Sequence, residues 1–384
     1  AESTLHFIER GAWWLHIIGI LTFLNYLYFS KHLHILASDK YEGRETGEKG
    51  QKMAAEYIAK AFNAYKLTGP VKDSDNPNYQ HYDLTEESWG NVSIKNQNTE
   101  LKMNSDFLVY RGETGDKAVK MEFVFAGYGV ESEKYSDYKK VDVKGKMVVI
   151  LTGEAKSKKG IYWATGTKEP LKQDPTAILK EKGALGVILV QADKDYKKTL
   201  DTYGHYFTKA KLKLTYLEEK KEKDNFAVVF ASQTAITNLF KIKGKSLTKL
   251  IAKTNKKGVS PAGKFKTTAE FTIQKERKAV VAENVLGYME GTDKKEEVLV
   301  LTAHYDHIGI DEKGRINNGA DDDGSGTVAV LELAEAFSKA KEAGFAPRRS
   351  ILFMTVSGEE KGLLGSKYYS DHAIFDVKNT VTNL

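Results

Sequence analysis

Three short segments in the last ninety or so residues carry side chains that could bind a metal ion or move a proton. The first, residues 302–307 (TAHYDH), follows an apolar run. Residues two apart in an extended chain project to the same side, so His304 and Asp306 can lie together. A metal-binding histidine commonly donates its other ring N–H to a carboxylate. The pattern indicates His304 as a ligand and Asp306 as the group that orients it, although a polar strand end has the same pattern.

The second segment, residues 318–326 (NGADDDGSG), holds three successive carboxylates directly before a helical pattern. Like charges this close repel one another unless a cation offsets them. A helix N-terminus also favours anions, so a capping cluster is the simpler alternative. The alternating aspartates and closing glutamate of an EF-hand are missing, and the Gly-Lys-Ser/Thr ending of a phosphate-binding loop is missing too.

The third segment, residues 357–360 (SGEE), directly follows an apolar run. Carboxylates at the end of a buried strand are unfavourable without a partner. One of the two, Glu359 or Glu360, could bind a metal, and the other could stand beside it as a general base. Taken alone, a Glu-Glu pair is more typical of surface charge.

The elements around these segments predict how the side chains are positioned. Residues 298–303 and 350–356 are apolar runs of strand length, and residues 326–339 have helical periodicity. A strand, a helix and a second strand at this spacing predict a parallel or mixed sheet with helices on its faces. Sites in such proteins lie at the loops that follow the strands, so we expect the three segments to converge there.

Together the segments resemble the co-catalytic zinc aminopeptidases, a family that also includes glutamate carboxypeptidases. The resemblance runs through AHYDHIG, GADDDGSG and SGEEKGLLGS, and ASDKYEGRETG resembles the family's opening segment. Residues 126–154 resemble the protease-associated domain that many members carry as an insertion. The resemblance covers residues 31–384. It implies an α/β fold with a mixed, mostly parallel sheet flanked by helices (the zinc exopeptidase fold) and an inserted β-rich protease-associated domain.

The resemblance also implies roles for individual residues. In such enzymes two zinc ions share a bridging carboxylate and a bridging water. Asp322 would be the bridge, His304 would ligate one zinc ion and Glu360 would ligate the other. Asp306 would orient His304. Glu359 would be the general base that carries a proton from the water to the leaving amine.

A two-zinc site of this family needs a second histidine and a third terminal carboxylate, and the sequence departs from that pattern. After Glu360 the remaining side chains of these types are Asp371, His372 and Asp376. They fall in a polar helix-and-loop stretch, so we do not expect them to be ligands. The family's next ligand is an aspartate on the strand that residues 378–384 would begin. We therefore expect a C-terminally truncated fragment that lacks two metal ligands.

Length and composition exclude several other classes of protein. A chain of 384 residues is long enough for two or three domains. It has no cysteine, which excludes a disulfide framework, thiolate zinc fingers and iron–sulfur clusters. The net charge of +6 comes mostly from lysines interspersed with acidic residues. Nucleic-acid surfaces favour clustered arginine with aromatic residues, so we expect no nucleic-acid partner.

We expect the catalytic domain in two pieces, residues 31–104 and residues 276–384. Between them, residues 105–275 have their own strand and helix pattern and would form the protease-associated insertion. Residues 1–30 would be a separate apolar segment.

The N-terminal segment is apolar enough to reach a membrane. Residues 11–30 contain no Asp, Glu, Lys or Arg, and twenty apolar residues can span a bilayer. A membrane anchor through residues 12–29, a buried helix and a stretch foreign to the normal protein all stay open. Because such peptidases usually act outside the cytoplasm, we expect a secreted or periplasmic protein, membrane-anchored if this segment spans.

The leading interpretation is a zinc-dependent exopeptidase, an aminopeptidase that hydrolyses peptide substrates. One alternative is a metal-free receptor or binding protein of the same fold. The other is a single-zinc acyltransferase of the glutaminyl cyclase type. The choice between aminopeptidase and carboxypeptidase depends on groups that hold the substrate ends, and the three segments do not include these.

Overall fold

The structure is a computed structural model, and it describes residues 29–72, 74–219, 224–243 and 246–384. The chain divides into two compact units. The first unit comprises the described residues of 1–86, 212–220 and 279–384, and the second those of 87–211 and 221–278.

Two long strands, β1 (Tyr79–Asn96) and β9 (Lys266–Met289), contribute residues to both units. The division falls inside these strands, at 86/87 and 278/279. The sequence pattern instead suggested boundaries at 104/105 and 275/276. Buried and exposed residues alternate from Gln80 to Leu84, and residues 85–90, where the division falls in β1, are all half-buried.

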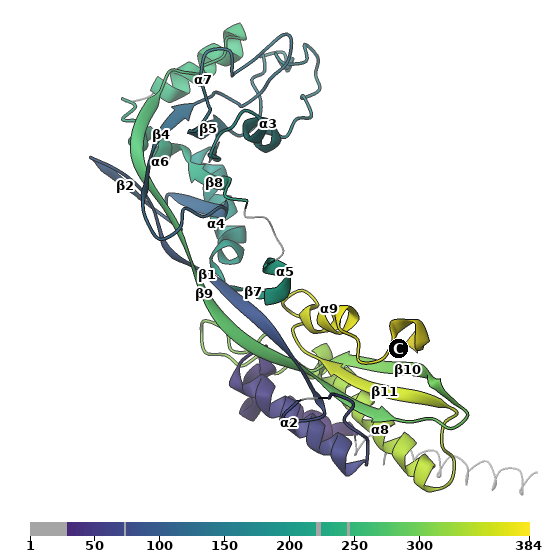
Figure 1. The fold of residues 1–384 in the computed structure, drawn as a ribbon. Coiled ribbons are helices and arrows are strands. Elements are labelled where there is room, and N and C mark those ends of the chain that lie inside the picture. The colour runs from purple at the N-terminus through teal and green to yellow at the C-terminus, as the bar shows by residue number, and fades with distance from the viewer. Residues whose placement is uncertain (1–28, 73, 220–223, 244–245) are drawn as a thin grey trace, which may run out of the picture. The chain divides into compact units, whose positions relative to one another are not determined.

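The second unit contains a mixed sheet (Figure 1). Its further strands are β2 (Thr99–Lys102), β3 (Phe107–Arg111), β4 (Val119–Phe125), β5 (Met147–Leu151), β6 (Gly186–Gln191) and β8 (Ala227–Ser232). The order is β9-β4-β5-β6-β8-β3, and the four strands from β4 to β8 run parallel. Its described residues also form the helices α3 (Pro175–Glu181), α4 (Asp193–Thr208), α6 (Gln233–Leu239) and α7 (Ser246–Lys257).

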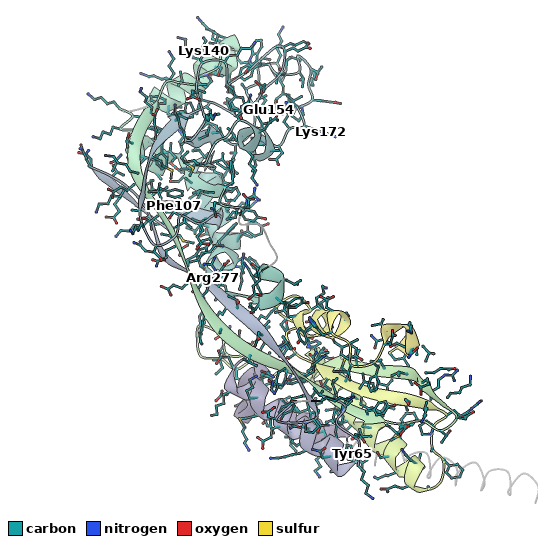
Figure 2. The ribbon with its side chains drawn as sticks, viewed as in Figure 1. Tyr65, Phe107, Lys140, Glu154, Lys172 and Arg277 are labelled. Atoms are coloured by element: carbon teal, nitrogen blue, oxygen red, sulfur yellow. The ribbon has the colours of Figure 1, made fainter. Side chains whose placement is uncertain are left out.

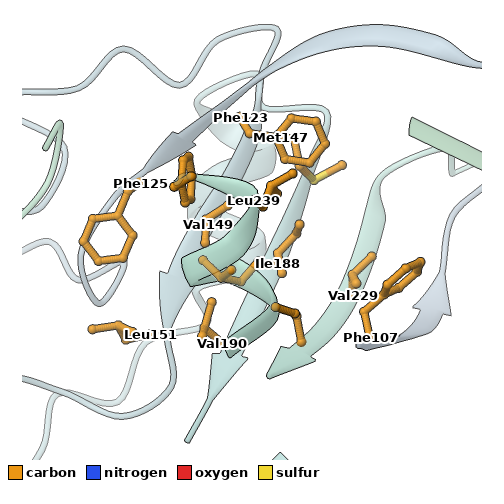
Figure 3. Packing of buried hydrophobic residues seen from close by; sticks show 14 of the residues in the cluster. Phe107, Phe123, Phe125, Met147, Val149, Leu151, Ile188, Val190, Val229 and Leu239 are labelled. Carbon is orange, nitrogen blue, oxygen red and sulfur yellow. The ribbon is translucent and has the colours of Figure 1, made fainter. Parts of the chain in front are cut away.

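The core of the second unit is formed by side chains from neighbouring strands. Phe107, labelled in Figure 2, is fully buried together with Phe123 and Val149 in one cluster (Figure 3). Leu239 of α6 belongs to the same cluster. The parallel strands read as continuous apolar runs because they are buried on both faces.

The first unit is built on the sheet β12-β10-β11-β9. Its helices include α2 (Lys49–Ala64), α5 (Thr215–Glu218), α8 (Ser325–Glu342) and α9 (Leu364–Asp371). Its strands include β7 (Lys211–Leu214), β10 (Lys294–His304), β11 (Arg349–Val356) and β12 (Thr380–Asn383). Short helical turns are η1 (Asp39–Arg44), η2 (Ala320–Gly324) and η3 (Val377–Asn379). β10 runs parallel to both of its neighbours, and β9 is antiparallel to β11. The predicted fold class, a mixed and mostly parallel sheet flanked by helices, is confirmed.

Successive side chains of β11 enter two different cores. Phe353 packs with Phe62 of α2 and Phe337 of α8, at ring-centroid distances of 6.5 and 6.2 Å. The next residue, Met354, lies in a separate cluster with Tyr369 of α9. Because adjacent side chains of a strand point to opposite faces, both faces of the sheet are covered by helices.

The apolar segment 12–29 lies outside the described residues, apart from Phe29. Residues 29–36 are helical. In the part of the chain that the structure describes, no helix is both long enough and apolar enough to cross a membrane.

We expect Phe353→Ala to lower the free energy of unfolding of the first unit by about 3–5 kcal/mol, because it opens a cavity between the sheet and two helices. Phe353 is 0% exposed, whereas Phe345 is 78% exposed. Phe345→Ala removes the same atoms from a solvated position and should change the free energy by less than about 0.5 kcal/mol. Urea denaturation followed by circular dichroism measures both values. Equal stability of the two variants would contradict the packing.

Candidate metal centre

The ends of two parallel strands bring the first and third acidic segments together. In the β10–β11 pair His304 lies opposite Val356, so both strands end at the same level. The chain then turns at Gly358, whose φ is +75°. A Cβ at this position would lie 2.9 Å from the Leu364 side chain. The glycine therefore allows the turn that places Glu359 next to the end of β10.

The second acidic segment is fixed to the end of β10 by hydrogen bonds. The Asp323 carboxylate accepts the backbone N–H of His304 at 3.1 Å and that of Gly326 at 3.0 Å. The Thr327 hydroxyl donates to the His304 carbonyl oxygen at 2.9 Å. Asp323 thus caps the start of α8, and these contacts hold Asp322 beside His304.

Five ionisable side chains from these segments converge. His304 Nε2 lies 3.2 Å from Asp322 Oδ1 and 3.8 Å from Glu359 Oε2. His307 Nδ1 lies 2.6 Å from Glu360 Oε1. One ligand atom each from His307, Asp322 and Glu360 lies within 4.8 Å of the other two. Of the residues suggested by the sequence, His304, Asp322, Glu359 and Glu360 are brought together, and His307 joins them.

The donor set fits a zinc ion. His307 Nδ1 and Glu360 Oε1 are buried, yet neither has a hydrogen-bond partner among the described residues, although the two atoms are close. Two buried polar atoms without hydrogen bonds raise the free energy of the folded chain unless a third group contacts both. A cation does so, and imidazole nitrogens and carboxylate oxygens are ligands that zinc takes.

Asp306 lies behind His304 and is fully buried. Its Oδ2 accepts the Thr46 hydroxyl at 2.7 Å and its Oδ1 accepts the Glu359 N–H at 3.3 Å. His304 Nδ1 lies 3.1 Å from the Asp306 carbonyl oxygen and 3.7 Å from Oδ1. Burial disfavours the charged form of His304, but Asp306 outweighs this and raises the pKa of His304 to about 9. The arrangement leaves Nε2 facing Asp322.

A buried arginine from the N-terminal part of the chain joins three segments of the site. Arg44 is 1% exposed. Its Nε donates to the Tyr305 carbonyl at 2.7 Å, and its Nη2 donates to that of Gly319 at 2.8 Å. Its Nη1 donates to the Leu36 and Asn318 carbonyls at 2.6 and 2.7 Å. Burial lowers the pKa of Arg44, and nearby carboxylates partly oppose that shift.

The three residues that the sequence analysis did not expect to be metal ligands have other partners. Asp371 accepts a hydrogen bond from Tyr216, and His372 stacks on Tyr368 with ring centroids 4.3 Å apart. Asp376 accepts the backbone N–H of Lys378 in η3.

Sequence reasoning missed His307, Arg44 and Thr46 as residues of the site. A signal for His307 was present, because it follows His304 by three residues in the same motif. No signal identified Arg44 and Thr46, because their partners lie about 260 residues further along the chain. The resemblance of the opening segment pointed to this region without assigning roles.

Comparison with known proteins identifies the segment that carries these residues. Residues 284–384 match the profile described as Peptidase family M28. This stretch contains all three acidic segments and both histidines of the cluster. The predicted family is thereby confirmed over this part of the chain.

Curated relatives match over between 26% and 29% of the chain. A "Probable zinc metalloprotease" from Leptosphaeria maculans is 36% identical over 103 residues, 26% of this chain and 22% of the relative. A "Probable glutamate carboxypeptidase" from Zea mays is 30% identical over 29% of this chain and 14% of its own. The "Vacuolar membrane protease" of Saccharomyces cerevisiae is 35% identical over 26% and 9%. The matches thus span between 9% and 22% of these relatives' lengths.

Solved structures match over most of the chain but at low similarity. An aminopeptidase from Aneurinibacillus sp. strain AM-1 has a TM-score of 0.47 and 19% identity, covering 93% of this chain and 68% of that one. A zinc aminopeptidase from Bacillus subtilis has a TM-score of 0.41 and 18% identity, covering 92% and 68%.

We expect Arg44→Met to lower the free energy of unfolding by at least about 3 kcal/mol, because four carbonyl oxygens lose their donor in a buried setting. Zinc affinity should fall as well, since the loop at Asn318 and the end of β10 lose a shared anchor. Arg315→Met is the control, because the Arg315 side chain is 74% exposed. Urea denaturation and zinc calorimetry measure the two effects. Wild-type zinc binding by Arg44→Met would refute the positioning role.

Proposed function

We propose that the chain carries the metal centre of a zinc-dependent exopeptidase, an aminopeptidase acting on peptides. The convergence of His304, Asp322, Glu359 and Glu360 at the ends of β10 and β11 is the observation that carries the proposal. The M28 match over residues 284–384 supports it. The curated relatives, which include probable zinc metalloproteases, point the same way.

In this proposal His304, Asp322 and Glu360 would hold zinc, with His307 beside Glu360. His304 Nε2 lies 3.2 Å from Asp322 Oδ1, so the two side chains could contact the same ion. Bound zinc would polarise the scissile carbonyl and bring the pKa of a bound water toward neutrality. Asp306 orients His304 by accepting on the Nδ1 side, which directs Nε2 toward the ligand cluster.

Glu359 is proposed as the general base. Its backbone N–H is held by Asp306 Oδ1, and its side chain is 36% exposed, so its carboxylate can reach both solvent and the cluster. It would accept a proton from the attacking water and pass it to the leaving amine. Its neighbour Glu360 is 18% exposed and is aimed at His307, so the two glutamates have different surroundings.

We further propose that the second unit contains a protease-associated-type insertion and that the protein works outside the cytoplasm. The first point is supported by the resemblance of residues 126–154. Support for the second comes from the relatives named vacuolar membrane proteases.

The decisive test compares zinc content and cleavage of leucine-, alanine- and lysine-anilide in four variants of the intact protein. Glu359→Gln should keep zinc and lose activity by about 10²- to 10⁴-fold, because it removes the proton acceptor. Asp322→Asn should lose zinc. Asp321→Asn and Glu312→Gln are matched controls at exposed positions and should behave as wild type.

Two results would reject the proposal. A wild-type protein without zinc would leave a metal-free receptor of the same fold. A protein that holds one zinc ion and cyclises amino-terminal glutamine without cleaving anilides would instead be the acyltransferase type. Retained activity in Glu359→Gln would reject the assigned base alone.

A further inference from the structure

The second unit contains a cavity that lies apart from the proposed metal centre. It has a volume of about 470 Å³ and lies at the carboxyl ends of β5 and β6. Its wall is mainly apolar and includes the side chains of Tyr128, Tyr162, Leu171 and Leu189, and it contains one acidic residue, Glu154. Ligand pockets commonly have this size and this mixture of apolar wall and few polar groups. The loops after parallel strands are a usual place for such pockets.

Glu154 is labelled in Figure 2. Its carboxylate is only partly satisfied. The backbone N–H of Leu171 donates to it. Its Oε2 atom is buried and has no hydrogen-bond partner among the described residues. Burial raises the pKa of the Glu154 carboxyl group and so disfavours its charged form. A buried acceptor of this kind costs free energy until a donor reaches it.

A lysine of the chain lies nearby but does not fill this role. Lys156 sits over the ring of Tyr162, with its Nζ 5.6 Å from the ring centroid. In the described part of the chain no ion pair joins Glu154 to Lys156 or to another cation. Lys156 is thus engaged with the Tyr162 ring and leaves Glu154 without a cationic partner among the described residues.

We propose that this cavity binds a small organic cation, a protonated primary amine on an apolar or aromatic body. The ammonium group donates to Glu154 Oε2 and lies near the tyrosine rings. The apolar body is buried against Leu171 and Leu189. Two sources offer this chemistry: a free arylalkylamine, and the amino terminus of a peptide whose first side chain is apolar. The site is independent of zinc and of the proposed reaction.

The test measures binding of phenethylamine and of its neutral counterpart 2-phenylethanol to the whole chain by calorimetry, with a chelator present to prevent hydrolysis. Phenethylamine should bind about ten- to a hundredfold more tightly, the difference expected from one charge-assisted hydrogen bond. Glu154→Gln should abolish that difference. Glu169→Gln removes an exposed charge from the same loop outside the cavity and should preserve it.

Peptide probes separate the two sources. If phenylalanyl-alanine amide binds as tightly as phenethylamine, and N-acetylation of this peptide abolishes its binding, the ligand is a peptide amino terminus. Binding of phenethylamine alone identifies the free amine.

The proposal is overturned if the amine and the alcohol bind equally, or if neither binds at millimolar concentration, as when water alone satisfies Oε2. It is overturned as well if Glu154→Gln, folded by circular dichroism, binds phenethylamine as the wild type does.

Discussion

The guanidinium group of Arg44 is buried among four backbone carbonyl oxygens that come from three distant parts of the chain. One is contributed by Leu36, one by Tyr305 at the end of β10, and two by the loop at Asn318 and Gly319. A planar group with five donors in a fixed fork can satisfy this many acceptors, and no other side chain can. The positions of the histidine and aspartate segments relative to each other depend on it.

Charge balance makes the same region dependent on a cation. Asp322, Glu359 and Glu360 lie close together, and Lys361, which follows them in sequence, is paired with Glu45 at 2.6 Å. Carboxylates held this near to one another raise the free energy of the folded chain unless positive charge offsets them. A zinc ion would supply that charge, so we expect metal binding and the stability of these loops to be coupled.

Much of the fold could be predicted because periodicity reports burial directly. The predicted strand 298–303 and helix 326–339 correspond to β10 (Lys294–His304) and α8 (Ser325–Glu342). The site residues at strand ends could be suggested for the same reason. The partners of Arg44 could not be predicted. They are backbone carbonyl oxygens, which every type of residue has, so the sequence does not reveal them. The full length of β9 was not predicted either, because no turn residues mark the position in this strand where the division between the units falls.

The division into two units determines the order in which the parts of this protein are completed during translation. Arg44 and its partner Tyr305 are separated by 261 positions, and the second unit lies between them in the chain. At a usual elongation rate, between roughly 13 and 52 s pass after Arg44 is made before Tyr305 is added. During that interval the apolar face of α2, with Ile58 and Phe62, lacks the strands that will cover it. During translation the second unit is therefore complete while the first unit still exposes the apolar face of α2. A chaperone would bind this apolar surface.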